Sequence, residues 1–489
     1  MRKRNGLFSI VMFLLTLFAA CGTVIAATIQ SDAKAKYVFL FIGDGMGAAQ
    51  RKAAELYLEQ VKDPGRPAGE KSLMNSLPAQ GMNTTLDLTG AIPDSASTAT
   101  AIATGRKTNS GTIGMDPEGK VRYENIAETA GKKGWKIGII STVNLDSATP
   151  AAFYAHAANR GQLHEISMQL AGSGFDYFAG GQLLEPSDRE DPAAPNAIRT
   201  ARQNGYTVAI GRRQFQALKP GIGKVLAMSE TVDDNAAMYF TLDRHRDAKD
   251  VSLAEYLAKG IELLENPKGF FIMVEGGKID WACHANDAAS AVHDVLALDD
   301  AIAGAFSFYR KHPEETLIVV TGDHETGGLT IQFDGTRYSP VVYRLMHRKM
   351  SYIEIDRQIG EYRRAHSPDD AKLEDLMPLI ADAFGLHPPS SEGANREAGM
   401  NLDDPELFAL RDAFRRSMFG KHPFGSHEPL TTKLTTILDN KAGLAWTSSS
   451  HTATPVQTSA VGVGARLFNG CYDQTDIYVK MMNITGLQR

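Results

Sequence analysis

Residues 37–42 read Tyr-Val-Phe-Leu-Phe-Ile, an unbroken apolar run that ends two residues before Asp44. Three later runs share this character: Lys136-Ile-Gly-Ile-Ile140, Gly269-Phe-Phe-Ile-Met-Val274 and Thr316-Leu-Ile-Val-Val320. Continuous hydrophobicity over such short stretches is typical of strands that are buried on both faces, as in a parallel sheet. Helical stretches alternate with these runs. We therefore predict an α/β fold in which a largely parallel central sheet carries helices on both faces.

Polar residues with possible chemistry follow each of these predicted strands. They are Asp44, Ser141 and Thr142 leading on to Thr149, Glu275, and the pair Asp323 and His324. In open α/β sheets, ligands bind at the carboxyl ends of the strands. Chance explains one carboxylate at such a position, but three strands that end in carboxylates indicate a site.

The pattern changes at residues 338–430, where the sequence becomes charged and helical. Ile353 to Arg364 and Pro405 to Met418 are expected to be helices, and Pro388 to Gly393 is expected to be a loop between helices. We interpret residues 338–430 as a mainly helical insertion. It either covers the rim of the site and narrows access, provides a homodimer contact, or is a solvated appendage without a catalytic part.

The first residues have the pattern of an export signal. Arg2, Lys3 and Arg4 are followed by an apolar run from Leu7 to Ala20 and by small residues up to Ala26. This order predicts a signal peptide over residues 1–26 and a periplasmic or secreted mature chain over residues 27–489. A membrane anchor is the alternative, but the run is short for a span of about 20 residues.

Lipidation of Cys21 is a second alternative for the exported chain. Phe18, at the start of the preceding Phe-Ala-Ala segment, is an unusual residue for a lipoprotein signal, so cleaved export is favoured. Only Cys283 and Cys471 would remain after cleavage. An exported protein of this size does not need a disulfide, so both are compatible with free thiols.

The net charge bears on the binding partners. It is formally −6, and cleavage after Ala26 would remove three positive and no negative charges, which gives −9. An acidic surface argues against a nucleic-acid-binding protein, because phosphate-backbone binding depends on clustered Lys and Arg. A small phosphate-containing substrate remains compatible if its site is locally cationic.

The segment from Asp94 to Ala101 consists largely of small residues, and its Ala-rich continuation predicts a helix. Ser95 would then lie at the helix N-terminus, where backbone N–H groups and the helix dipole favour a phosphate. A serine hydroxyl is a weak nucleophile unless a base or a metal activates it. Because Asp and Ser are both favoured N-cap residues, helix capping is the better explanation of this segment taken alone.

Carboxylate and imidazole groups elsewhere in the chain suit Zn²⁺. Asp280 and His284 are four residues apart and share one face of a helix. The candidates are Asp280, His284, Asp323, His324 and His451, each of which taken alone is explained as a surface or core residue. Cys283 reaches the same face as Asp280 but is interpreted as a packing residue, and His422 and His427 as surface residues.

Taken together, these segments resemble the bacterial alkaline phosphatases. The motifs are Phe41-Ile-Gly-Asp-Gly-Met-Gly47, the segment around Asp94 and Ser95, Asp146-Ser-Ala-Thr-Pro150, Val274-Glu-Gly-Gly-Lys-Ile-Asp280, Thr321-Gly-Asp-His324 and the segment around His451. They follow the order of the family and extend over nearly the whole mature chain. The resemblance implies an alkaline-phosphatase-like fold and the hydrolysis of phosphate monoesters.

The resemblance also assigns roles to individual residues. Ser95 matches the residue that is phosphorylated and then hydrolysed. Arg160 matches the arginine that holds the non-bridging phosphate oxygens, a task for which a guanidinium fork is suited. Without the motif around it, Arg160 would be interpreted as a surface arginine.

Three metal sites follow from the same resemblance. Asp280, His284 and His451 match the ligands of one Zn²⁺, which would activate the water that releases phosphate. Asp44, Asp323 and His324 match those of a second Zn²⁺, which would activate Ser95. Asp44, Thr149 and Glu275 match a Mg²⁺ site, and Mg²⁺ prefers oxygen ligands. Two metals about 4 Å apart stabilise the attacking and leaving oxygens of an in-line displacement.

Two residues beside these ligands depart from the family. Trp281 stands where relatives often have Lys or His, and Ser147 stands where they often have Asp or His. We expect both to alter the water network around Mg²⁺ and the hold on product phosphate.

Three other functions are considered. A phosphodiesterase of the same superfamily would need an open second pocket where Arg160 is expected. A sulfatase would need a Pro and Arg signature after its nucleophile, which the segment after Ser95 lacks. A non-catalytic phosphate- or metal-binding protein would need only part of this set of residues.

Overall fold

The structure is a computed structural model that describes residues 34–61, 72–233, 235–244, 249–334, 340–388, 398–420 and 427–487. The predicted signal peptide, Cys21, residues 389–393 of the predicted loop and His422 lie outside these ranges. Within the described ranges, no helix has both the length and the hydropathy that crossing a membrane requires.

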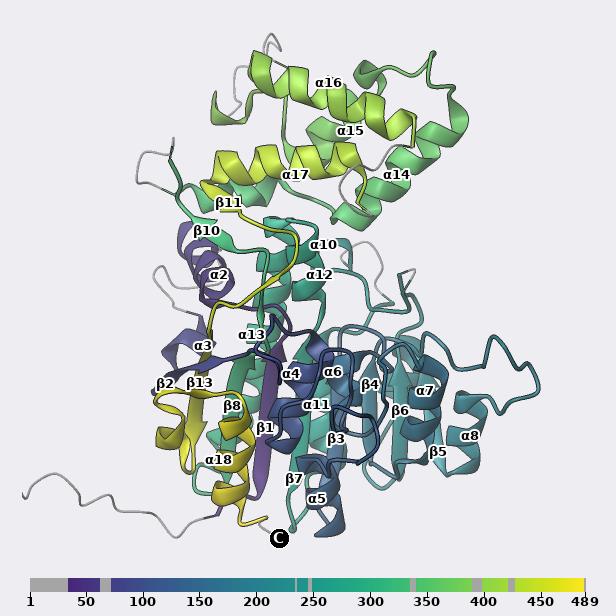
Figure 1. Ribbon diagram of the computed structural model, residues 1–489, viewed down its shortest axis with the longest axis vertical. Coiled ribbons are helices and arrows are strands. Elements are labelled where there is room, and N and C mark those ends of the chain that lie inside the picture. Colours follow the sequence, from purple (N-terminus) through teal and green to yellow (C-terminus); the bar gives the residue numbers. More distant parts are fainter. Residues whose placement is uncertain are drawn as a thin grey trace, which may run out of the picture. The chain divides into compact units, whose positions relative to one another are not determined.

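A ten-stranded sheet organises the chain, in the order β14-β2-β13-β8-β1-β7-β3-β4-β6-β5. Figure 1 shows the strands of this sheet side by side, from β2 to β5. Their bounds are β1 Tyr37–Gly43, β2 Ala79–Thr84, β3 Lys136–Ser141, β4 Tyr177–Gly180, β5 Tyr206–Ile210, β6 Lys224–Met228, β7 Phe270–Gly276, β8 Thr316–Gly322, β13 Val456–Gly462 and β14 Gly470–Asp473. Only β13 is antiparallel to its neighbours, β8 and β2; the other neighbouring pairs are parallel. The predicted strands and their largely parallel arrangement are confirmed.

The register of the three central strands brings the predicted site residues together. Ile42 of β1 lies beside Glu275 of β7 and Thr321 of β8. Gly43, the last residue of β1, likewise lies beside the glycines that end β7 and β8. The carboxyl ends of β1, β7 and β8 are therefore level, so the residues that follow them meet at one edge.

Helices cover both faces of the sheet because side chains alternate along each strand. Phe39 and Phe41 of β1 belong to the apolar cluster on one face, and Val38 and Leu40 to the cluster on the other. The first face is covered by α2 Ala48–Gln60, α3 Leu73–Ser76, α9 Gly211–Gln216, α10 Thr241–Arg244, α11 Leu253–Leu264, α12 Lys278–His284 and α13 Ala288–Tyr309. The second is covered by α4 Ser95–Thr104, α5 Ile126–Lys132, α6 Ala148–Ala151, α7 Leu163–Gly172, α8 Ala197–Gln203 and α18 Thr475–Thr485, with the 3-10 helix η3 Ala465–Phe468.

The described part of residues 338–430 is mainly helical, as predicted. Its elements are η1 Val342–His347, α14 Tyr352–Ala365, α15 Leu373–Phe384, η2 Ala398–Met400 and α16 Asp404–Met418, followed by α17 Pro429–Ala442. Its apolar side chains join the cluster that includes α2 and α13. At its base, Asp287, the N-cap of α13, accepts hydrogen bonds from Arg348 and from the backbone of Tyr352. The insertion thus packs against α2 and α13, which are helices of the first face.

Candidate active site

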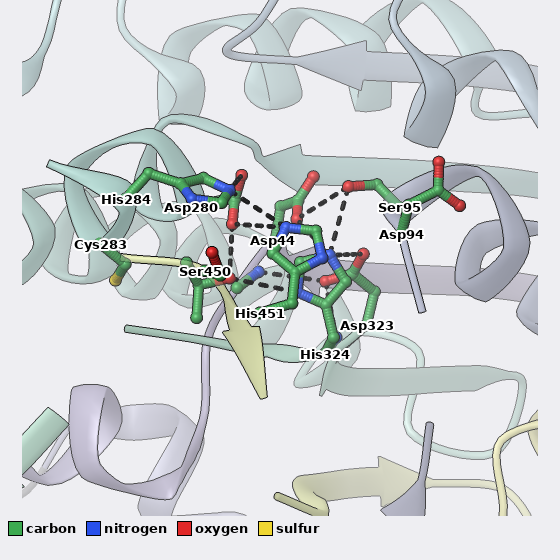
Figure 2. Close-up of polar contacts among 12 residues, drawn as sticks. Asp44, Asp94, Ser95, Asp280, Cys283, His284, Asp323, His324, Ser450 and His451 are labelled. Carbon is green, nitrogen blue, oxygen red and sulfur yellow. Dashed lines mark hydrogen bonds and ion pairs between the residues drawn. The ribbon is translucent and has the colours of Figure 1, made fainter. Parts of the chain in front are cut away.

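Ser95 is the first residue of α4, and the residue before it caps the helix. The Asp94 carboxylate accepts a hydrogen bond from the backbone N–H of Ser97 at 3.0 Å. The hydroxyl of Ser95 instead faces the strand ends, 3.4 Å from Asp44 Oδ1 and 3.2 Å from His324 Nε2. Figure 2 shows Ser95 directed at this cluster. Capping and a reactive hydroxyl are therefore compatible, because Asp94 provides the cap and leaves Ser95 available.

Asp44, Asp323 and His324 form one group of candidate ligands. His324 Nε2 lies 3.4 Å from Asp44 Oδ1 and 3.3 Å from Asp323 Oδ2. All three side chains are buried, and one ligand atom from each lies within 4.8 Å of the others. Asp323 is oriented by the N–H of Gly45 at 3.1 Å and by the hydroxyl of Thr98 at 3.0 Å.

Asp280, His284 and His451 meet beside the first group. The Nε2 atoms of His284 and His451 lie 3.3 and 3.6 Å from the Asp280 carboxylate oxygens and 3.1 Å from each other. Their Nδ1 atoms lie 2.7 and 2.8 Å from the carbonyl oxygens of Ser449 and Pro93. Because a carbonyl only accepts, each Nδ1 carries a proton, and each Nε2 is the ring nitrogen that faces the Asp280 carboxylate. Burial lowers the pKa of His284, but the neighbouring Asp280 outweighs it and raises the pKa to about 9. A cation between the two Nε2 atoms would compete with the proton on His284.

A two-stranded sheet joins the two groups. It consists of β9 Glu325–Thr326 and β12 His451–Thr452, with His451 paired with Thr326. The rings of His324 and His451 stack with centroids 3.7 Å apart. His324 therefore lies close to both groups, and one ligand atom from each of Asp280, His324 and His451 also falls within 4.8 Å.

The predicted oxygen-ligand site lies on the other side of Asp44. Thr149, on α6, donates to Asp44 Oδ2 at 3.2 Å. Glu275 is fully buried, and its Oε2 accepts from Ser141 Oγ at 2.5 Å. Its Oε1 accepts no hydrogen bond within the described residues. The two oxygens of Asp44 thus face two different groups, as a carboxylate shared by two sites must.

The electrostatics of the cluster favour cations. Burial and the neighbouring carboxylates Asp323 and Asp280 raise the pKa of Asp44 well above its usual range. Burial raises the pKa of Glu275 to about 8. At Asp280 the nearby imidazoles outweigh burial and lower the pKa of the carboxyl. Among the described residues, no Lys or Arg forms an ion pair with these carboxylates. Oxygen and imidazole donors, the unmatched Oε1 of Glu275 and two facing Nε2 atoms fit divalent metal ions.

Arg160 lies at the edge of the cluster, in the loop between α6 and α7. Its guanidinium pairs with Asp94 Oδ2 at 3.0 Å, and its side chain is 39% exposed. Its charge lowers the pKa of Asp44, in opposition to burial, so it acts within electrostatic reach of the site. Burial raises the pKa of Asp94, but Arg160 and the backbone N–H groups outweigh it, so the net pKa is lowered. Asp94, the N-cap of α4, thus holds Arg160 near Ser95.

Ser147 and Trp281, the two departures from the family, lie beside the ligands. Ser147 is the N-cap of α6, although its hydroxyl makes no capping hydrogen bond. Trp281 is half-buried, and its ring centroid lies 4.6 Å from Lys278 Nζ. Lys278 is fully buried and forms an ion pair with Asp233.

Cys283 and His427 are the two other side chains that the sequence analysis interpreted as residues outside the ligand set. Cys283 is buried and packs in the core, as predicted, and burial raises the pKa of its thiol. His427 was expected to be a surface residue and not a ligand. It is partly exposed, and its ring lies against Tyr352 of α14, with centroids 5.8 Å apart. Neither side chain belongs to the two ligand groups described above.

The sequence interpretation missed the residues that orient the ligands. Thr98 lies one helical turn after Ser95, and Thr326 donates to Asp280 Oδ1 at 2.6 Å. Glu325 accepts from Gln50 at 2.7 Å and from Thr452 at 2.5 Å, which ties β9 to β12. The helical spacing between Ser95 and Thr98 is a signal from which Thr98 could have been identified. No pattern in the sequence indicates the contact of Gln50 with Glu325.

Comparisons with known proteins agree with this geometry. The family profile described as alkaline phosphatase matches residues 35–178 and 194–487. Alkaline phosphatase 4 of Bacillus subtilis (strain 168) is 27% identical over 462 residues, which cover 91% of this chain and 88% of that protein. The crystal structure of a cold-active alkaline phosphatase from the psychrophile Shewanella sp. is 28% identical, with a TM-score of 0.74 over 92% of this chain and 99% of that one. The Thermus thermophilus alkaline phosphatase, 21% identical, shares the fold with a TM-score of 0.78 over 96% of this chain and 95% of its own.

The family match includes every segment that contributes to the cluster. Alkaline phosphatases are metal-dependent, and the two groups of candidate ligands agree with that property. The chain belongs to the alkaline phosphatase family and is a phosphomonoester hydrolase.

Proposed function

We propose that this enzyme hydrolyses phosphate monoesters through a covalent phosphoserine at Ser95, in a site that holds two Zn²⁺ and one Mg²⁺. The observation that carries the proposal is the position of Ser95 Oγ, within 3.4 Å of both Asp44 and His324 at the start of α4. A serine there has the activating surroundings that its hydroxyl needs as a nucleophile.

The ligand groups divide by chemistry. Asp280, His284 and His451 would hold one Zn²⁺, and Asp44, Asp323 and His324 the other, because both sets offer carboxylate and imidazole donors. Asp44, Thr149 and Glu275 offer only oxygen and would hold Mg²⁺. Such ions, when bound, supply positive charge that favours ionised oxygen nucleophiles and stabilises the phosphoryl oxygens.

The protein's own groups would act in two steps. Arg160, tethered by Asp94, would hold the non-bridging oxygens of the ester with its guanidinium fork. In the first step Ser95 Oγ forms a bond to phosphorus and loses its proton to solvent, while the bond to the alcohol oxygen breaks and the alcohol takes up a proton. In the second step the oxygen of a water molecule bonds to phosphorus and the bond to Ser95 Oγ breaks. A proton of that water returns to Ser95 Oγ through solvent, and inorganic phosphate leaves. The N-terminal end of the α4 dipole favours the negative charge throughout.

Ser95→Ala tests the mechanism. We expect hydrolysis of a phosphate monoester to fall by about 10³-fold or more, with the fold and metal content retained, since the nucleophile itself is removed. Brief incubation with substrate at acidic pH should add one phosphate to the wild type by mass spectrometry, and none to the variant. Ser97→Ala is the matched control, because that serine donates to the Asp94 carbonyl on the same helix and does not face the ligands.

Full activity in Ser95→Ala would contradict the mechanism, as would loss of activity in Ser97→Ala of the same size. A parallel comparison of a monoester with a diester separates this proposal from a phosphodiesterase. Faster turnover of the diester would favour the alternative.

Export is a further part of the proposal. The order of basic, apolar and small residues before Ala26 supports cleavage of residues 1–26 and a periplasmic or secreted mature enzyme. N-terminal sequencing of the exported protein tests it: a chain that begins at Ala27 is expected, and one that begins at a lipidated Cys21 would overturn it.

A further inference from the structure

A cavity of about 900 Å³ lies beside the ligand groups. Its walls come from three parts of the chain: Trp281 on α12, the segment that contains Asp233 and Tyr239, and helix α14 of the insertion with Tyr352. The volume is in the range of pockets that bind small molecules. No residue of the two ligand groups lines it, so the cavity is separate from the place where the phosphate would be held.

The side of phosphorus on which the alcohol leaves determines whether the alcohol can reach the cavity. In an in-line displacement the attacking and leaving oxygens lie on opposite sides of phosphorus. Figure 2 shows Ser95 at one end of the cluster and His284 at the other, with Asp44 and His451 between them. The alcohol of a bound ester would therefore leave on the side of Asp280, His284 and His451.

The cavity lies on that same side. Trp281 directly follows Asp280 on α12 and lines the cavity. His427, whose ring lies against Tyr352 of α14, also lines it. An alcohol group that extends from the phosphate past His284 would meet these walls.

The aromatic walls are held in place by buried contacts. Lys278 Nζ lies 4.6 Å from the ring centroid of Trp281 and 3.9 Å from that of Phe240, and it is paired with Asp233. Tyr352 packs against Phe240, with ring centroids 5.5 Å apart. Ring positions that are fixed before a ligand binds reduce the entropy lost on binding.

Several of the charges in the walls are matched within the protein. Asp233 is paired with Lys278, and Glu354 is paired with Arg357 at 2.6 Å. Asp243 accepts from the backbone N–H of Ser351 at 2.9 Å. Tyr239, Trp281 and Tyr352 add aromatic side chains to the same walls, which suit a planar ring.

We infer that this cavity binds the alcohol part of the substrate and favours phosphate monoesters whose alcohol carries a planar ring, with nucleoside 5′-monophosphates as the representative class. The inference rests on the proposed function for the orientation of the ester. Stacking of one base on an aromatic side chain corresponds to a loss of about tenfold or more when that side chain is truncated.

Tyr239 is the position to change, because its ring lines the cavity and it is not a candidate ligand. The readout is the ratio of kcat/KM for adenosine 5′-monophosphate to kcat/KM for glycerol phosphate. We expect Tyr239→Ala to lower this ratio by about tenfold, mainly through KM, and Tyr239→Phe to retain it. Tyr309→Ala, at the end of α13 and outside the cavity, is the matched control.

An unchanged ratio in Tyr239→Ala would overturn the inference and leave the phosphomonoesterase mechanism intact. An equal loss on both esters would also overturn it, because it would show an effect on the chemistry or the fold. Calorimetric binding of adenosine, which has no phosphate, tests the cavity without turnover. If the wild type turned over neither ester, the proposed function would fail, while adenosine binding to the wild type and not to Tyr239→Ala would still support the cavity.

Discussion

Buried carboxylates occur in two regions of this molecule, with different surroundings. At the base of the insertion, Asp287 is 1% exposed and is matched by Arg348 at 3.0 Å and by the backbone N–H groups of Ser290 and Tyr352. At the carboxyl ends of the central strands, Glu275 is 0% exposed, and its hydrogen bond in the described chain is with Ser141.

This difference indicates what each region is for. An ionised carboxylate in the interior is costly unless it is paired and hydrogen-bonded. The protein itself supplies those partners to Asp287. It supplies too few to Asp44 and Glu275, whose pKa values are raised for that reason. The first carboxylate is a structural element, and the others belong to the candidate metal ligands.

Removal of metals should separate the two regions most clearly. We expect chelation to lower monoesterase activity by about 10⁴-fold or more, since metal ions supply several kcal/mol of transition-state stabilisation. Readdition of Zn²⁺ and Mg²⁺ to the chelated protein should restore it. Retained activity in protein shown by elemental analysis to be metal-free would contradict the interpretation of the cluster.

The pH dependence of stability gives chelation a second readout. In the metal-free protein the folded-state pKa of Glu275 is raised to about 8, and that of Asp44 is also raised. The folded state then binds these protons more tightly than the unfolded state, so stability falls as pH rises from about 4 to about 8. Bound cations would offset this loss. The drop in Tm on chelation should therefore be larger at pH 8 than at pH 5.

The matched region is tested by Arg348→Met. Loss of one partner of a buried pair leaves the other charge uncompensated, and we expect the free energy of unfolding to fall by about 3–5 kcal/mol. Denaturant unfolding measures it, and metal content should not change. Lys349→Met is the control, because the ion pair between Lys349 and Asp382 is exposed and should contribute less than about 1 kcal/mol. Equal effects of the two substitutions would remove the distinction between buried and exposed pairs.

Within the cluster, Glu275→Gln keeps the shape of the side chain and its bond with Ser141 but removes the charge. We expect activity to fall by about 10–100-fold and the Mg²⁺ concentration for half-maximal activity to rise, since changes around a metal site have effects of this size. Titration of activity with Mg²⁺ measures both. Glu262→Gln, at an exposed helix position, should change neither, and an unchanged Mg²⁺ response in Glu275→Gln would argue against Glu275 as a ligand.

Much of this site was predictable from the sequence for a physical reason. Apolar runs such as residues 37–42 identify buried parallel strands, and parallel strands bring their carboxyl ends to one edge. The spacing of Asp280 and His284 identifies one face of a helix. Each of these signals lies within a short segment of the sequence, so it can be recognised without knowledge of the fold.

The remaining features depend on contacts between distant segments. Gln50 donates a hydrogen bond to Glu325, which is 275 positions away in the sequence. Neither residue type by itself predicts this hydrogen bond. Nothing near His427 in the sequence shows that its ring lies against Tyr352. The cavity is likewise lined by Trp281 of α12 and by residues of α14, a juxtaposition that residue patterns alone do not show.

Asp356 in the insertion offers the smallest test of the comparison, because it is an unmatched carboxylate outside the ligand groups. Burial and Glu428 raise its pKa to about 7, although Thr431 lowers it. Since the unfolded value is about 3.9, its ionisation makes the folded state less stable as pH rises from about 4 to 7, and the loss is complete above that range. The Asp356→Asn variant cannot ionise at this position and should be more stable than the wild type at pH 8 by about 1–2 kcal/mol. The full pKa shift would correspond to roughly 4 kcal/mol. The expected gain is smaller because the Asp356 side chain borders an open cavity. The two proteins should converge near pH 4. Denaturant unfolding at both pH values measures the difference, with the exposed Asp382→Asn as control, and a gain that is equal at the two pH values would show that packing, not charge, is responsible.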